Sequence, residues 1–345
     1  MKKVLIQVNT EFHYMVALSL IDKYYSGPDF DVHFIVFVHP VFRSRLATVN
    51  LDPRYTYHHV EYDHNMKKVF PDVLEIKKFI EGNQFYHFIS FLYSDPLFVY
   101  LTDYFKRKGT TTYLAPDGMG AYVKFQSKNY RSRLMNSLNS YKFFRLHGLK
   151  FGKLWFTSWD FGRNGYYDYI YAYSKTLPYL NNKKIVEVDY TFSPSSLESL
   201  KKTFGVDFDG IPMDNVVLLI NERHKVVNYE KQLIDAIRKE KPGATILFKK
   251  HPNQAPENLE YLKQYPDIIV LDKVFPVELL IASLTNSVII SSYSNCMLYH
   301  NPTCKYFWTY PIVEKSGEFS KPIERYNPKK YINVVESFDE LRSKL

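Results

Sequence analysis

Cysteine is scarce in this sequence, and long apolar runs are missing from it. The 345 residues include two cysteines, Cys296 and Cys304, without the spacing of a metal site or a disulfide framework. No stretch approaches the roughly 18 uninterrupted apolar residues of a transmembrane helix. The apolar run near the N-terminus is also too short for the core of a signal peptide. These absences predict a cytoplasmic protein, and they leave peripheral contact with the inner membrane face open.

The motifs of several common enzyme classes are absent as well. The loops at 8–12 and 220–224, each after an apolar strand, lack the G-x-G-x-x-G glycines, which disfavours a nicotinamide dehydrogenase. The chain has no Walker A loop, no G-x-S-x-G elbow and no H-E-x-x-H helix, so three further classes are disfavoured. No signature of the usual RNA-binding modules occurs, and we expect no nucleic-acid partner.

Positive charge and aromatic side chains are what the sequence has in excess. The net charge is +9, from 45 Lys and Arg against 36 Asp and Glu, which suits an anionic partner such as a nucleotide sugar or an acidic membrane. The segment 128–153 carries no acidic residue and interleaves its basic residues with apolar ones. Two interpretations stay open for it: a surface that meets anionic lipid or a charged acceptor, or a solvated helical face packed by its aromatics.

Strand and helix patterns alternate along the chain, which predicts an α/β protein with parallel sheets covered by helices. Strands are predicted at 4–8, 32–37, 55–60, 87–92, 111–114, 169–173, 216–220, 244–248, 268–271 and 287–290. Helices are predicted at 11–24, 67–81, 96–107, 194–204, 228–239, 256–264, 276–284, 295–300 and 337–345. The turn-rich segment 205–215 reads as a linker, so we expect two domains, 1–205 and 206–345. The sequence leaves open that the C-terminal helix at 337–345 packs back on the first domain.

The most informative residues follow the predicted strand 244–248, where the chain reads Lys249-Lys250-His251-Pro252. Proline ends the strand because it has no backbone donor. Ligands of open α/β sheets bind outside the carboxyl ends of the strands, so an imidazole and two ammonium groups there suit an anionic ligand. Because side chains alternate along a strand, we expect only one of the two lysines on the side of His251.

Other polar residues follow predicted strands, and each has a structural alternative to a functional role. Asp117 is a candidate general base, although Pro-Asp-Gly is also a common turn. Glu278 could accept from ribose hydroxyls or simply complement a helix dipole. Ser291 and Ser292 could bind a phosphate, or serve only as helix caps.

The order of these motifs resembles that of bacterial inverting sialyltransferases with the GT-B fold, especially the lipooligosaccharide and capsule sialyltransferases of glycosyltransferase family 52. Those families share an acidic-Asp-Gly motif, a His-Pro motif and a Ser-Ser motif in this order. The corresponding residues here are Pro116-Asp117-Gly118, His251-Pro252 and Ser291-Ser292. Glu278 stands at the family's ribose-contacting position, whereas Pro116 replaces the first acidic residue of the Asp-Gly motif.

The resemblance implies two Rossmann-like domains that face a central cleft, with the acceptor on the side of 1–205 and the nucleotide sugar on 206–345. It implies a single displacement from CMP-sialic acid to a hydroxyl of a surface glycan, lipooligosaccharide or capsule. By this analogy Asp117 is the catalytic base and His251 stabilises the departing phosphate. The nucleotide site then comprises His251, Pro252, Glu278, Ser291 and Ser292.

No cofactor or metal is expected, because a monophosphate leaving group needs less charge neutralisation than a diphosphate and side chains can supply it. Three alternatives stay open. One is another CMP- or CDP-dependent transferase that uses 3-deoxy-octulosonate (Kdo) or a polyol phosphate. Another is a UDP-sugar transferase of the same fold. The third is a protein that binds an anionic polymer without turnover.

Overall fold

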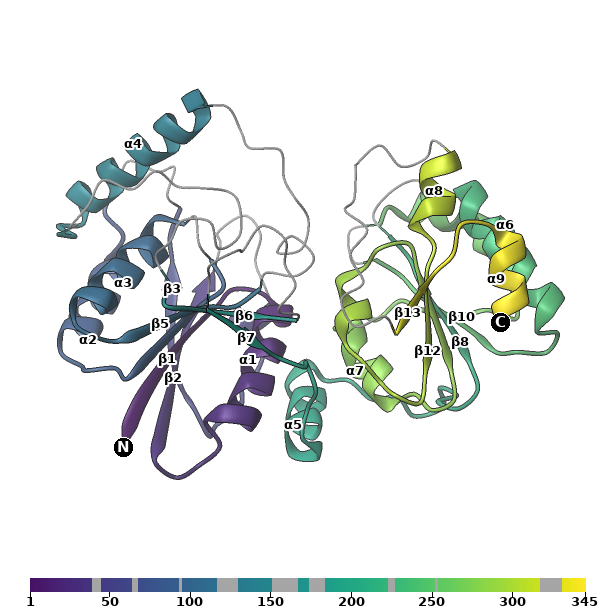
Figure 1. The fold of residues 1–345 in the computed structure, drawn as a ribbon, viewed down its shortest axis with the longest axis horizontal. Helices are drawn as coiled ribbons and strands as arrows, with labels where there is room; N and C mark the ends of the chain where they lie inside the picture. The colour runs from purple at the N-terminus through teal and green to yellow at the C-terminus, as the bar shows by residue number, and fades with distance from the viewer. Residues whose placement is uncertain are drawn as a thin grey trace. The chain divides into compact units, whose positions relative to one another are not determined.

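The computed structural model describes residues 1–38, 45–63, 68–92, 95–116, 130–150, 167–173, 184–222, 227–251, 254–316 and 331–345. The chain divides into two compact units, Met1–Phe204 and Gly205–Leu345, each built on one parallel sheet (Figure 1). None of the helices in these described ranges is long and apolar enough to cross a membrane. The sheets and their flanking helices confirm the predicted α/β class.

The first unit contains a seven-stranded sheet in the order β3-β2-β1-β4-β5-β6-β7. Its strands are β1 Lys2–Val8, β2 Phe30–Val38, β3 Thr56–Glu61, β4 His87–Ser90, β5 Thr111–Leu114, β6 Tyr169–Ala172 and β7 Ile185–Glu187. Strands β1 and β2 are nearly continuous apolar runs because helices cover both faces of the sheet. After β3 the chain returns to the other side of β1, where β4 pairs with it.

Two helices in the first unit begin with both a capping side chain and a proline. The helices of this unit are α1 Glu11–Tyr24, α2 Pro71–Glu81, α3 Pro96–Arg107, α4 Tyr130–Leu146 and α5 Pro194–Phe204, with a 3-10 turn η1 at Arg45–Ala47. Asp95 caps α3 by accepting from the Leu97 N–H at 3.0 Å, and Ser193 caps α5 by accepting from the Ser196 N–H at 3.2 Å. Both are residue types that favour N-caps, and proline occupies the first helical position after each of them.

The second unit contains a six-stranded sheet in the order β10-β9-β8-β11-β12-β13. Its strands are β8 Val217–Ile220, β9 Ile246–Lys249, β10 Ile269–Leu271, β11 Val288–Ser291, β12 Lys305–Trp308 and β13 Ile332–Val334. Its helical segments are α6 Val227–Glu240, η3 Pro256–Gln264, α7 Val277–Ser283, η4 Asn295–Leu298, α8 Tyr310–Ser316 and α9 Phe338–Lys344. All the strands of the sheet are parallel.

Several elements of the second unit differ from the prediction. The segments expected as α-helices at 256–264 and 295–300 are 3-10 helices, η3 and η4, and strands β12 and β13 were not predicted. The terminal helix α9 packs on α6 of its own unit, where Leu341 is fully buried and the Arg342 Nε lies 3.6 Å from the Glu240 Oε1. A contact of this helix with the first domain, which the sequence left open, stays a prediction.

Candidate active site

The sheet of the second unit changes direction between β8 and β11. From β8 the chain runs to β9 and β10 on one side, and it then crosses to β11, β12 and β13 on the other. Such a reversal leaves a crevice at the carboxyl ends of the central strands, where α/β proteins bind their ligands. The residues at the carboxyl ends of β8, β9 and β11 lie along this edge.

Asn221, the first residue after β8, positions the chain at His251. It is buried, and its Oδ1 accepts from the His251 backbone N–H at 3.1 Å while its own N–H donates to the Lys249 carbonyl at 3.0 Å. Its Nδ2 donates to the Glu230 Oε1 at 2.7 Å, and the Glu230 Oε2 accepts from the Tyr261 hydroxyl at 2.6 Å. Asn221 therefore joins the His251 segment to helix α6.

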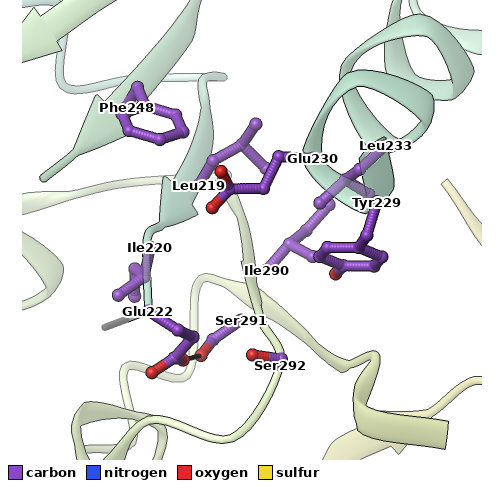
Figure 2. A pocket seen from close by; sticks show the side chains of 10 residues that line it. All are labelled: Leu219, Ile220, Glu222, Tyr229, Glu230, Leu233, Phe248, Ile290, Ser291 and Ser292. Atoms are coloured by element: carbon purple, nitrogen blue, oxygen red, sulfur yellow. Dashed lines mark hydrogen bonds between the residues drawn. The ribbon is translucent and has the colours of Figure 1, made fainter. Parts of the chain in front are cut away.

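Glu222, the next residue, holds the segment after β11 (Figure 2). The Ser291 hydroxyl donates to the Glu222 Oε1 at 2.6 Å, and the Tyr293 N–H donates to the same oxygen at 3.3 Å. The Ser291 Oγ in turn accepts from the Ser294 N–H at 2.9 Å. Burial raises the pKa of Glu222, and hydrogen bonds from both Ser291 and Ser292 oppose that rise. The predicted serine pair is therefore organised around a buried carboxyl group.

The pocket drawn in Figure 2 lies beneath these residues, between the sheet and α6. Its lining includes Leu219, Tyr229, Phe248 and Ile290 together with Glu222 and Glu230. Its volume is about 10 Å³, which is room for about one water molecule. This cavity is far too small for a ligand of nucleotide size.

Lys249 and Glu278 form a second buried group at this edge. The Lys249 Nζ donates to the carbonyls of Lys250 and Lys273 at 3.2 and 3.3 Å and lies 4.6 Å from the centre of the Phe275 ring. Burial lowers the pKa of Lys249 to about 8, while the charges of Asp272 and Glu278 act in the opposite direction. Burial raises the pKa of Glu278 to about 7, against its own backbone N–H and the charge of Lys249. Their charges therefore influence each other.

The two lysines of the strand end differ in their surroundings, as alternation along β9 predicts. Lys249 is buried near Glu278, whereas the Lys250 ammonium is partly exposed and lies 3.7 Å from the Asp272 carboxylate. Glu278 also influences the thiol of buried Cys296, which follows the serine segment. The Glu278 carboxylate therefore interacts electrostatically with residues from both the end of β9 and the segment after β11.

The first unit has the same kind of reversal, between β1 and β4. There the buried Gln7 of β1 accepts through its Oε1 from the N–H groups of Phe91 and Leu92, at 2.9 and 3.0 Å. Pro116 follows β5 on the same edge and is buried. Asp117 and Gly118 lie outside the described residues, as does Pro252 in the second unit, so the predicted roles of Asp117 and Pro252 stay predictions.

The structure brings together four of the sequence candidates, His251, Glu278, Ser291 and Ser292, at the edge of one sheet. The sequence reasoning missed Asn221 and Glu222. Asn221 and Glu222 directly follow the apolar strand predicted at 216–220. Polar residues after an apolar strand are the same signal that identifies His251 and Ser291. The loop at 220–224 was used only to exclude a glycine-rich motif.

Solved structures of similar fold include several glycosyltransferases. The sialyltransferase of Photobacterium damsela is 13% identical over 89% of this chain and 74% of that one, with a TM-score of 0.51. The glycotransferase of kitacinnamycin is 10% identical over 99% of this chain and 89% of that one, with a TM-score of 0.51. The GT-B domain of a sialyltransferase from Photobacterium damselae is 14% identical over 89% and 91% of the two chains, with a TM-score of 0.49. The two parallel sheets and the two structures with a TM-score of 0.51 confirm the predicted GT-B fold.

The sequence itself is more specific than the fold. Residues 4–306 match the model of the alpha-2,8-polysialyltransferase (POLYST) family, and because the match covers most of the chain, the protein belongs to this family. The predicted class, a sialyltransferase, is confirmed at this level. No curated protein matches the sequence.

Proposed function

We propose that this protein is an inverting sialyltransferase that transfers sialic acid from CMP-sialic acid to a hydroxyl of a surface glycan. Membership of the polysialyltransferase family favours a capsule polymer over lipooligosaccharide, with sialic acid as the accepting sugar and an α-2,8 linkage as the product. The narrower resemblance to glycosyltransferase family 52 remains a prediction. One observation carries the proposal: the residues after β8, β9 and β11 converge on His251 and the serine pair.

The proposed reaction is a single displacement at the anomeric carbon of sialic acid. The acceptor oxygen forms a bond to this carbon as the bond to the CMP phosphate oxygen breaks, and the bonding electrons leave with the phosphate. Asp117 takes the proton of the acceptor hydroxyl. His251 donates a hydrogen bond or a proton to the departing phosphate, which stabilises the charge that develops there.

The surroundings of Glu278 and Lys249 support a nucleoside site beside the phosphate. An ionised Glu278 accepts hydrogen bonds from the two ribose hydroxyls of cytidine. Lys249 favours that ionised form because its ammonium group is a nearby positive charge in a buried environment. Lys249 therefore acts as a positioning residue rather than as a phosphate ligand.

The serine pair needs a rearrangement of hydrogen bonds before it can bind phosphate. Ser291 and Ser292 both direct hydrogen bonds to Glu222, and a hydroxyl has one proton to donate. In the proposed complex the serine hydroxyls turn from Glu222 to the phosphate oxygens. Glu222 remains bound by the Tyr293 N–H and keeps the segment in place.

A nucleotide screen followed by a donor screen tests this proposal. Thermal shifts with CMP, CDP, UDP and GDP identify the nucleotide, because a ligand that binds only the folded state raises its melting temperature. We expect CMP to give the largest shift. Transfer assays with CMP-sialic acid, CMP-Kdo and a CDP-linked polyol then separate the proposal from its nearest alternative. Turnover of UDP-sugars, or no turnover of any donor, would reject it.

A further inference from the structure

Helix α4 exposes several large hydrophobic side chains, which is unusual for a helix face in contact only with water. Of the ten exposed large hydrophobic residues in the described parts of the chain, five lie between its first turns and its end. They are Leu134, Met135, Leu138, Tyr141 and Leu146, which are 37%, 52%, 45%, 54% and 40% exposed. The small polar residues Ser137 and Ser140 of the same helix are buried instead.

The exposed residues form one continuous face of the helix. Leu134, Leu138, Tyr141 and Arg145 are spaced by four, three and four residues, which places them in a single row. Met135, Lys142 and Leu146 form a parallel row beside it. The opposite face carries Phe143 and Phe144, which are buried against α3 and the sheet. Within α4, the interpretation of a helical face packed by its aromatics therefore accounts for this side of the helix and leaves the exposed apolar side unexplained.

Positive charge accompanies this apolar face. Lys142 and Arg145 are exposed, and within the part of the chain that the structure describes neither forms an ion pair. The segment 128–153 contains no acidic residue, against seven basic ones, Lys128, Arg131, Arg133, Lys142, Arg145, Lys150 and Lys153. Helix α4 lies on the outside of α3 in the first unit (Figure 1). Its 17 residues give it a length of about 25 Å.

We propose that this face, which we call the α4 face (Leu134, Met135, Leu138, Tyr141, Lys142, Arg145 and Leu146), docks on an anionic lipid bilayer. Leucine and methionine side chains insert among the acyl chains near the headgroups while lysine and arginine contact anionic headgroups. A polyanionic glycan would match the charges equally well. It offers nothing to cover the aliphatic side chains, however, and the bilayer is the partner that satisfies both.

Vesicle sedimentation without donor or acceptor tests the docking separately from the proposed enzyme activity. Wild-type protein should bind phosphatidylcholine vesicles that contain phosphatidylglycerol, and bind vesicles of pure phosphatidylcholine at least tenfold less. Lys142→Gln/Arg145→Gln should weaken binding about 30-fold, from the attraction of each basic residue to an anionic surface. Leu134→Gln/Leu138→Gln should weaken it at least tenfold, because two buried leucines are lost from the interface.

Two matched pairs control for unspecific loss of charge or apolar surface. Val270→Gln/Val274→Gln removes exposed apolar residues of the second unit, and Lys202→Gln/Lys239→Gln removes exposed basic ones. We expect both controls to bind within twofold of wild type, with unchanged melting temperatures and CMP shifts in all four variants.

Three outcomes would overturn the docking proposal. The first is that wild-type protein does not bind anionic vesicles. The second is that the control variants lose as much vesicle binding as the variants of the α4 face. The third is a leucine pair with wild-type vesicle binding while Lys142→Gln/Arg145→Gln loses binding to soluble polysialic acid. That result would assign the α4 face to a polyanionic acceptor instead.

Discussion

Asn221→Ala is the substitution that tests most sharply how the site is assembled. It removes the acceptor of the His251 N–H, in a part-buried hydrogen bond, and the donor to the Glu230 carboxylate, in a buried one. Removing these two hydrogen bonds, one of them to a carboxylate, costs about 2 to 4 kcal/mol. In a chain of 345 residues we expect the melting temperature to fall by roughly 3 to 6 °C.

The same substitution should reduce activity by more than instability explains. Without Asn221 the His251 segment loses its tie to α6, so the imidazole no longer has a fixed position against the departing phosphate. We expect kcat to fall at least about tenfold and CMP binding to weaken, both measured at a temperature where the variant is fully folded. A misplaced catalytic group commonly costs that much or more.

Asn301→Ala is the matched control. Asn301 is buried in the same unit and donates to the carbonyls of Ile281 and Leu284 at 2.7 and 2.8 Å. It precedes β12 and so lies at the amino end of the sheet, opposite the site. This variant should lose stability but keep wild-type kcat and CMP affinity. Equal activity in the two variants would refute the role assigned to Asn221.

Three further predictions concern residues of the proposed reaction. Asp117→Ala should abolish transfer but leave CMP binding nearly intact, and retained turnover would reject Asp117 as the base. His251→Ala should impair both turnover and CMP binding, as measured by kinetics and calorimetry. CMP affinity should fall as the pH is lowered through about 7, because acid protonates Glu278, whose pKa is raised, and only the ionised form accepts from both ribose hydroxyls. Glu278→Gln should bind CMP weakly, and its CMP affinity should no longer change near pH 7. A change in affinity near pH 6 should remain in this variant, because the phosphate itself titrates there.

Much of the fold is predictable because apolar patterns and caps are local. The continuous apolar runs of β1 and β2 identify buried parallel strands, and Asp95 and Ser193 mark helix starts. Strand β7 has three partly buried residues and gives no such signal. Strand β12, with the sequence Lys-Tyr-Phe-Trp, has no alternation that would identify it.

The composition of the site is less predictable because it depends on the order of strands in space. Glu222 and Ser291 are 69 residues apart in the sequence, and they meet only because β8 and β11 are neighbours in the sheet. Asn221 reaches the His251 segment because β9 lies on the other side of β8. Neither strand pairing can be predicted from the local sequence pattern. The family motifs therefore identified His251 and the serine pair, but not Asn221 and Glu222, which form hydrogen bonds with them.

The central claim, that this protein extends a sialic acid chain from CMP-sialic acid, is tested most directly by product analysis. Purified protein is incubated with CMP-sialic acid and a short α-2,8-linked oligosialic acid, and the products are separated by anion-exchange chromatography. We predict longer oligomers, one CMP released per sialic acid added, and digestion of the new linkages by an α-2,8-specific sialidase. An unchanged acceptor with this donor, together with product from CMP-Kdo or a CDP-linked polyol, would contradict the claim.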